Sequence, residues 1–121
     1  MQSEKPKIDI DKRTYSFALK TVNFVQKLKK DFVCIEIGKQ LLRSGTSVAA
    51  NVEEVQNAFS RNDFIFKMNI ALKESSETCL WLRLIKDAKI EVAENILNDL
   101  IEESSQLNKI IGRIVKTTRN S

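Results

Sequence analysis

Residues 41–59 read LLRSGTSVAANVEEVQNAF, and apolar or small residues recur within them at alternating intervals of four and three. The recurring positions are Leu41, Gly45, Val48, Val52, Val55 and Phe59. This heptad spacing predicts one long helix with a continuous seam for packing against neighbouring helices. A break into two shorter helices at Ser44-Gly45-Thr46 is the alternative. We favour a continuous helix that begins near residues 33–35, because the seam keeps its phase across Gly45.

The segments on either side of this helix repeat its rhythm. After it, Ser60 and Asp63 resemble a capping box, and a third seam follows at Phe64, Met68, Ala71, Ser75, Thr78, Leu82 and Ile85. Residues 87–89 form the next predicted connection, and a fourth helix that frays near Thr117 carries Ala93, Leu97, Leu100, Ser104, Leu107, Ile111 and Ile114. A first helix is predicted before the one that contains residues 41–59. Asp9 or Asp11 caps it, and it ends at about residues 27–31. Its predicted buried stripe is Tyr15, Ala18, Leu19, Val22, Val25 and Leu28, with Phe17 and Phe24 on a second face.

Four helices joined by short connections predict an all-α fold, an antiparallel up-down-up-down four-helix bundle. One proline and three glycines leave too few turns for a β-sandwich or barrel. The charged residues 1–10 are expected to form a flexible N-terminal arm, residues 11–118 a single bundle domain, and residues 119–121 a tail.

The amino-acid composition also excludes some kinds of catalytic and metal site. The chain contains no histidine, which excludes mechanisms and metal sites built on imidazole. It has no apolar run long enough to cross a membrane, and residues 1–13 show no signal peptide. Cys34 and Cys79 are therefore expected to be reduced, small apolar residues in a cytoplasmic protein.

The charge is positive and unevenly distributed. Twenty basic and sixteen acidic residues give +4, and residues 1–43, with ten basic and five acidic residues, account for +5. One interpretation is a surface for nucleic acid, and the other is ordinary solubility, helped by cations at a helix C-terminus. The candidate nucleic-acid-binding residues are Lys27, Lys29, Lys30, Lys39, Lys109, Arg113, Lys116 and Arg119.

The predicted third and fourth helices carry more apolar residues than one bundle core needs. A second stripe on the third helix contains Phe66, Ile70, Leu80, Trp81 and Leu84. Exposed apolar surface of this kind favours self-association. Trp81 and the six phenylalanines could stack on nucleic-acid bases, although their helical spacing favours core packing or subunit contact.

Polar residues gather on the second and third predicted helices. Arg43, Ser47, Asn51 and Glu54 share one side of the second, and Lys73 and Glu77 form an i, i+4 pair on the third. A carboxylate metal site built from Glu54, Glu74 and Glu77 is the alternative to salt bridges that fix helix register or a subunit contact. We favour the salt bridges, because carboxylate-bridged di-metal bundles use Glu-x-x-His pairs and the chain has no histidine.

Two segments resemble the four-helix-bundle proteins encoded in intervening sequences of bacterial 23S ribosomal RNA genes. They are residues 43–54, RSGTSVAANVEE, and residues 60–84, beginning SRNDF and containing IALKESSET and WLRL. The resemblance covers about residues 12–118. Two positions differ: residues 31–34 lack the proline frequent before the second helix, and Val55 replaces a small residue after Glu54. The motif's polar residues, expected to be structural or interfacial, include Arg43, Asn51, Glu54, Arg61, Lys73, Glu74 and Glu77, together with Trp81.

The resemblance implies a homopentameric ring of bundles. It also implies kinship with the accessory variability protein of diversity-generating retroelements, a basic pentamer that binds nucleic acid and a reverse transcriptase. For the intervening-sequence members it implies no activity. We therefore predict a non-enzymatic oligomeric scaffold without cofactor or metal that binds RNA or DNA. A protein–protein adaptor that binds no nucleic acid is the alternative.

Overall fold

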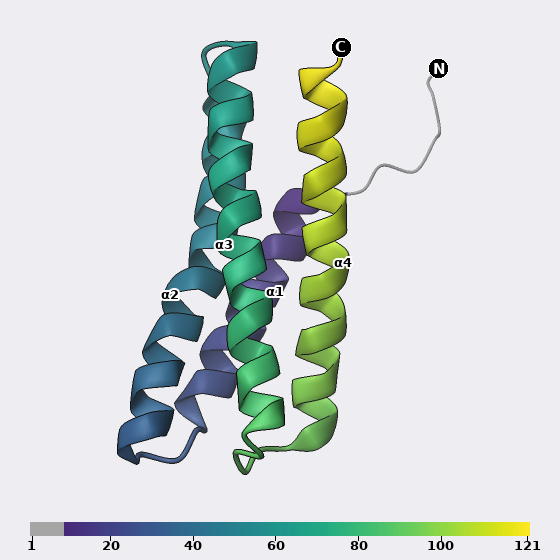
Figure 1. Ribbon diagram of the computed structural model, residues 1–121. Helices are drawn as coiled ribbons and strands as arrows, with labels where there is room; N and C mark the ends of the chain where they lie inside the picture. Colours follow the sequence, from purple (N-terminus) through teal and green to yellow (C-terminus); the bar gives the residue numbers. More distant parts are fainter. Residues whose placement is uncertain (1–8) are drawn as a thin grey trace.

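The computed structural model describes residues 9–121, which form four α-helices and one short 3₁₀ turn. The helices are α1 (Ile10–Gln26), α2 (Phe32–Glu54), α3 (Arg61–Asp87) and α4 (Glu94–Arg119), and the 3₁₀ turn η1 (Val55–Asn57) follows α2. They run alternately down and up along one bundle, so the all-α, up-down-up-down prediction is confirmed (Figure 1). None of these helices is long and apolar enough to span a membrane.

Side-chain caps determine where three of the helices begin. Asp9, Asp31 and Ser60 accept hydrogen bonds from the backbone N–H three residues later, which satisfies donors that a helix leaves free at its start. The predicted arm at residues 1–10 lies outside the described residues except for Asp9, which caps α1, and Ile10, which begins it.

The helices follow one another around the bundle. Within residues 9–121, α1 packs on α2 and more sparsely on α4, while α3 packs on both α2 and α4. Figure 1 shows the α1–α2 and α3–α4 connections at the lower end of the bundle, and the α2–α3 connection and the end of α4 at the upper end. The α1 helix has only 17 residues and lies beside the lower part of the bundle, whereas α3 has 27 (Figure 1).

The helix α2 is continuous through Gly45, as the preserved seam predicts, and it begins at Phe32, one residue before the predicted start at residues 33–35. Gly45 is buried against α1, where Thr21 Cγ2 would lie 3.1 Å from a Cβ at this position. The glycine therefore lets the two helices approach closely. The seam ends at Val55, because the chain then enters η1, and Phe59 is exposed rather than buried.

The predicted buried stripe of α1 is only partly right, since Ala18 and Leu28 are buried and Val22 and Val25 are half-buried. Tyr15 and Leu19 are exposed, and the residues that face the core are Thr14, Phe17, Ala18, Thr21, Phe24 and Leu28. The two threonines can be buried because each hydroxyl donates to a carbonyl oxygen one turn earlier, that of Ile10 or Phe17. The hydroxyls need no water there.

The seams of α3 and α4 are buried as predicted over most of their length. The side chain of Phe64 is half-buried, and Ala93 is exposed because it precedes α4 as its N-cap. On the second stripe of α3, Phe66, Leu80 and Leu84 are exposed, so the bundle leaves part of this stripe uncovered. The helix α4 continues past Thr117 to Arg119.

Candidate binding surfaces

Arg43 on α2 joins two carboxylates of α3. Its guanidinium donates to Glu74 Oε1 at 3.1 Å and also to Glu77 Oε2. The indole Nε1 of Trp81 donates to the same Glu77 oxygen at 3.0 Å. The bond from Trp81, and then the one from Arg43, hold the pKa of Glu77 below its usual range. This cluster links α2 to α3 through charge-assisted hydrogen bonds.

A buried polar pair that sequence reasoning did not single out lies beside this cluster. The hydroxyls of Ser44 and Thr78 are hydrogen-bonded at 2.9 Å between α2 and α3, and both side chains are almost fully buried. The available signal was the position of Thr78, with Ser75, on a seam whose other members are apolar. Each hydroxyl also lies within hydrogen-bond distance of a carbonyl oxygen of its own helix, that of Leu41 or Glu74. The Ser44–Thr78 bond is therefore an additional contact between α2 and α3, which sliding one helix along the other would break.

The other motif residues lie apart from the cluster. Asn51 donates within α2 to the carbonyl oxygen of Ser47 at 2.8 Å, and Lys73 on α3 is exposed. Arg61, at the start of α3, donates to the carbonyl oxygens of Thr118 and Arg119 at the end of α4. Its cation satisfies carbonyls that the helix leaves free and opposes the negative end of the helix dipole.

The structure does not assemble the alternative metal site. Glu54 is exposed and lies eleven residues after Arg43 on α2, which is about 16 Å along the helix axis. Glu74 and Glu77 are instead both paired with Arg43. Within residues 9–121 no group of three acidic, cysteine or histidine residues is placed to hold a metal ion.

The candidate basic residues form two groups at opposite ends of the bundle. Lys27, Lys29, Lys30 and Lys39 lie at or near the lower end, whereas Lys109, Arg113, Lys116 and Arg119 extend along the second half of α4 to the upper end. All eight are exposed. One subunit therefore presents two separate basic surfaces.

Three of the lower lysines share a groove between α1 and α2, which we call the α1–α2 groove. Its cavity volume is about 280 Å³, and none of the described residues that line it is acidic. Its lining residues are Val25, Leu28, Lys29, Lys30, Cys34, Ile35, Gly38, Lys39 and Leu42. The ammonium of Lys30 donates to the carbonyl oxygens of Gln26 and Leu28 at the end of α1. The groove thus combines an apolar floor with a cationic edge.

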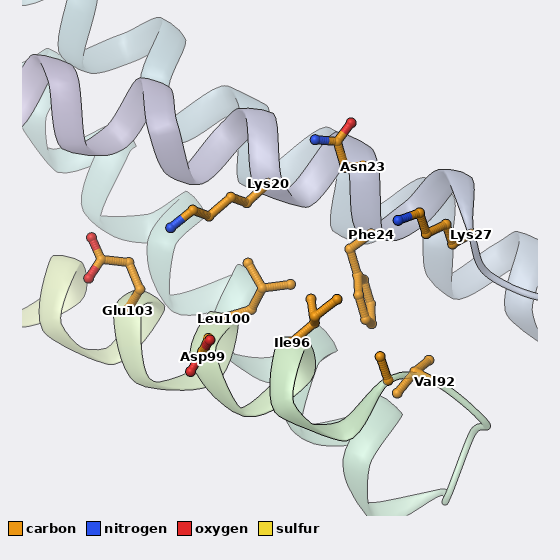
Figure 2. A pocket seen from close by; sticks show the side chains of 10 residues that line it. Lys20, Asn23, Phe24, Lys27, Val92, Ile96, Asp99, Leu100 and Glu103 are labelled. Atoms are coloured by element: carbon orange, nitrogen blue, oxygen red, sulfur yellow. The ribbon is translucent and has the colours of Figure 1, made fainter.

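Lys27 occupies a different environment, the α1–α4 cleft. This cleft of about 380 Å³ has Lys20 and Lys27 on its α1 wall and Asp99 and Glu103 on its α4 wall. Figure 2 shows Phe24, Ile96 and Leu100 between the two walls. Arg13 also pairs with Glu103 at 2.6 Å. The opposed charges make the cleft nearly neutral, so it is a poor site for a polyanion, and the charge count alone did not reveal this difference between Lys27 and the other lysines.

The aromatic residues divide into buried and exposed sets. Phe17 and Phe24 are in the core, and Trp81 is half-buried. Phe32, Phe59 and Phe66 are exposed by 84%, 95% and 64%. Of the two predicted roles, core packing or subunit contact, core packing does not hold for these three, because Phe32 and Phe59 lie where the chain enters α2 and α3, and Phe66 lies on the outer face of α3.

The four antiparallel helices and the α2–α3 polar cluster define a small helical-bundle protein. A sequence model of the 23S rRNA-intervening sequence protein family matches residues 6–113, and the chain belongs to that family. It is similar to a protein of unknown function from the S23 ribosomal protein family of Bacteroides thetaiotaomicron VPI-5482, whose crystal structure is solved. The two are 38% identical with a TM-score of 0.76, over 88% of this chain and 98% of the other. No curated protein matches the sequence.

Proposed function

We propose that the protein is a non-enzymatic, homo-oligomeric scaffold of the cytoplasm, a pentameric ring of bundles that binds RNA or DNA through its basic surface. The α1–α2 groove carries this proposal. Lys29, Lys30 and Lys39 line it, and within residues 9–121 it has no acidic lining residue. Its apolar floor is open to solvent, so a ligand can reach it. Cations beside an apolar surface suit a chain that has phosphates on one side and bases on the other.

Exposed apolar side chains on two different helices support the oligomer. Tyr15 and Leu19 are exposed by 63% and 51% on α1, and Phe66, Leu80 and Leu84 are exposed on α3. Within the described residues the backbones of α1 and α3 are not adjacent, and their buried side chains meet only in the core, so the two exposed sets lie on different sides of the bundle. Contact between unlike faces repeats from subunit to subunit and closes into a ring when the rotation allows. The number five comes from the family resemblance.

Light scattering coupled to size exclusion tests the oligomer, and two charge variants test its geometry. Leu19→Glu and Leu84→Glu should each give monomers, because each places a carboxylate in one of the two faces. Mixed together they should form a one-to-one dimer, because each partner retains one intact face. A monomeric wild type would refute the ring. A Leu84→Glu protein that stays oligomeric would refute the assignment of the α3 face.

Fluorescence anisotropy with labelled RNA and DNA at about 50 mM salt tests nucleic-acid binding. We expect binding that weakens steeply with salt, and a loss of affinity in Lys39→Gln. Lys73→Gln is the matched control, because Lys73 is equally an exposed helical lysine but lies on α3, outside the groove. Failure of the wild type to bind either nucleic acid would refute this function. Capture of a protein partner that resists nuclease treatment would then favour the adaptor.

A further inference from the structure

Phe32 is an unusually exposed aromatic residue whose position is set by a helix cap. Asp31 accepts a hydrogen bond from Cys34 N at 2.9 Å and so begins α2, and the side chain of Cys34 is buried. Phe32, the first residue of the helix, consequently points away from the core and is 84% exposed. Among the described residues the bundle gives its ring no covering partner, so it is available for a ligand that offers a flat apolar surface.

The surroundings of Phe32 are cationic. Lys29 and Lys30 lie in the connection immediately before it, and Lys39 lies seven residues after it, on the same side of α2. All three lysines line the α1–α2 groove. Residues 27–39 contain four lysines against Asp31 and Glu36, a net charge of +2. The Asp31 carboxylate is already bonded to the backbone as the helix cap.

We propose that this corner of the bundle binds single-stranded nucleic acid, with one base stacked on the Phe32 ring and the neighbouring phosphates held by Lys29 and Lys39. The proposal rests on the proposed function and adds the class of nucleic acid and the residue that selects it. A phenylalanine face can stack on any base, which gives affinity without sequence preference. In a duplex the bases are stacked and paired with one another, so the Phe32 ring favours a strand with free bases.

The Phe32→Ala variant tests the stacking separately from the charge. Labelled oligouridylate and oligothymidylate serve as single-stranded probes, and an oligo(dA)·oligo(dT) duplex is the double-stranded probe. We expect Phe32→Ala to weaken single-strand binding about tenfold, the effect of losing one stacked base, while duplex binding and the salt dependence stay unchanged. Lys39→Gln should instead weaken both kinds of probe and lower the salt slope by about one.

Phe59→Ala is the matched control, because Phe59 is a still more exposed phenylalanine at the opposite end of the bundle. It should leave single-strand affinity unchanged, and Phe32→Trp, with a larger ring, should preserve or increase it. The proposal is overturned if Phe32→Ala binds single strands as the wild type does, if Phe59→Ala weakens them equally, or if the duplex loses as much affinity. It is also overturned if Phe32→Ala dissociates the oligomer, because the ring would then be a subunit contact. A wild type that binds no nucleic acid overturns the proposed function itself, whereas the preceding outcomes leave that function intact.

Discussion

The substitution Gly45→Ala is expected to destabilise the protein, although alanine is the better helix former. A methyl group at Gly45 would lie 3.1 Å from Cγ2 and 3.4 Å from Oγ1 of Thr21. Carbon atoms pack best at about 3.5–4.0 Å. Thr21 is fully buried and its hydroxyl donates to the carbonyl oxygen of Phe17 at 2.9 Å, so its rotamer is fixed. The strain must therefore be relieved by moving α1 away from α2.

Two opposing effects determine the size of the change. Replacing glycine by alanine within a helix favours folding by about 1 kcal/mol, and overpacking a close-packed core costs about 1–3 kcal/mol. We expect Gly45→Ala to lower the free energy of unfolding by about 1 kcal/mol. Gly112→Ala on α4 is the internal comparison, because the nearest atom to its new methyl is Leu72 Cδ1, at an ordinary 3.8 Å. It should raise the free energy of unfolding by about 0.5–1 kcal/mol.

Urea denaturation of both variants at one fixed protein concentration measures these changes, since association also shifts apparent stability. The variant Thr21→Ser supplies a further check, because it removes the Cγ2 atom that the new methyl meets. The penalty of Gly45→Ala should shrink when it is measured in the Thr21→Ser background. If Gly45→Ala stabilises the protein as much as Gly112→Ala does, the close approach of α1 and α2 at this position is wrong.

Two further predictions concern charged groups. Because hydrogen bonds lower the folded-state pKa of Glu77, the stability it contributes is present above its unfolded pKa of about 4.3 and is lost as pH falls through the lower folded value. The difference in free energy of unfolding between wild type and Glu77→Gln should therefore be largest at neutral pH and shrink below about pH 4. Glu54→Gln is the control, because Glu54 is exposed. A difference that grows in acid would contradict the predicted direction of the pH dependence. Arg61→Ala should lower the free energy of unfolding by about 1 kcal/mol and speed amide hydrogen exchange at the end of α4. Unchanged exchange there would show that the bonds from Arg61 to the α4 carbonyls contribute little.

The sequence predicted the seams of α2, α3 and α4 because their buried positions are mostly apolar and regularly spaced. It failed on α1 for a specific physical reason. Thr14 and Thr21 look polar in the sequence but bury their hydroxyls by bonding to their own helix, whereas Tyr15 and Leu19 look like core and lie outside it. Helical periodicity locates an apolar face only when the buried residues are also the apolar ones.

The binding surfaces were less predictable than the fold, because they depend on which helices become neighbours. The sequence places Arg43 on one side of α2 with Asn51 and Glu54. It does not show that the two carboxylate partners of Arg43 come from α3. Similarly, the lysines of the first half of the chain looked equivalent in the sequence. The fold separates them. It places Lys27 opposite the acidic wall of the α1–α4 cleft, and Lys39 in a groove whose described lining contains no acidic residue.

The order of the helices around the bundle bears on how the chain folds. In the part of the chain that the structure describes, three of the four helix–helix contacts join helices that are consecutive in sequence, and only the sparse α1–α4 contact joins distant segments. Folding can therefore proceed by successive helical hairpins with small loop-closure entropy, a topology associated with microsecond-to-millisecond rates. The α1–α4 contact encloses most of the chain and has the fewest interactions to compensate for closing that loop. It is the contact that should form last and open first, so native fluctuations would widen the α1–α4 cleft before they disturb the core around α3.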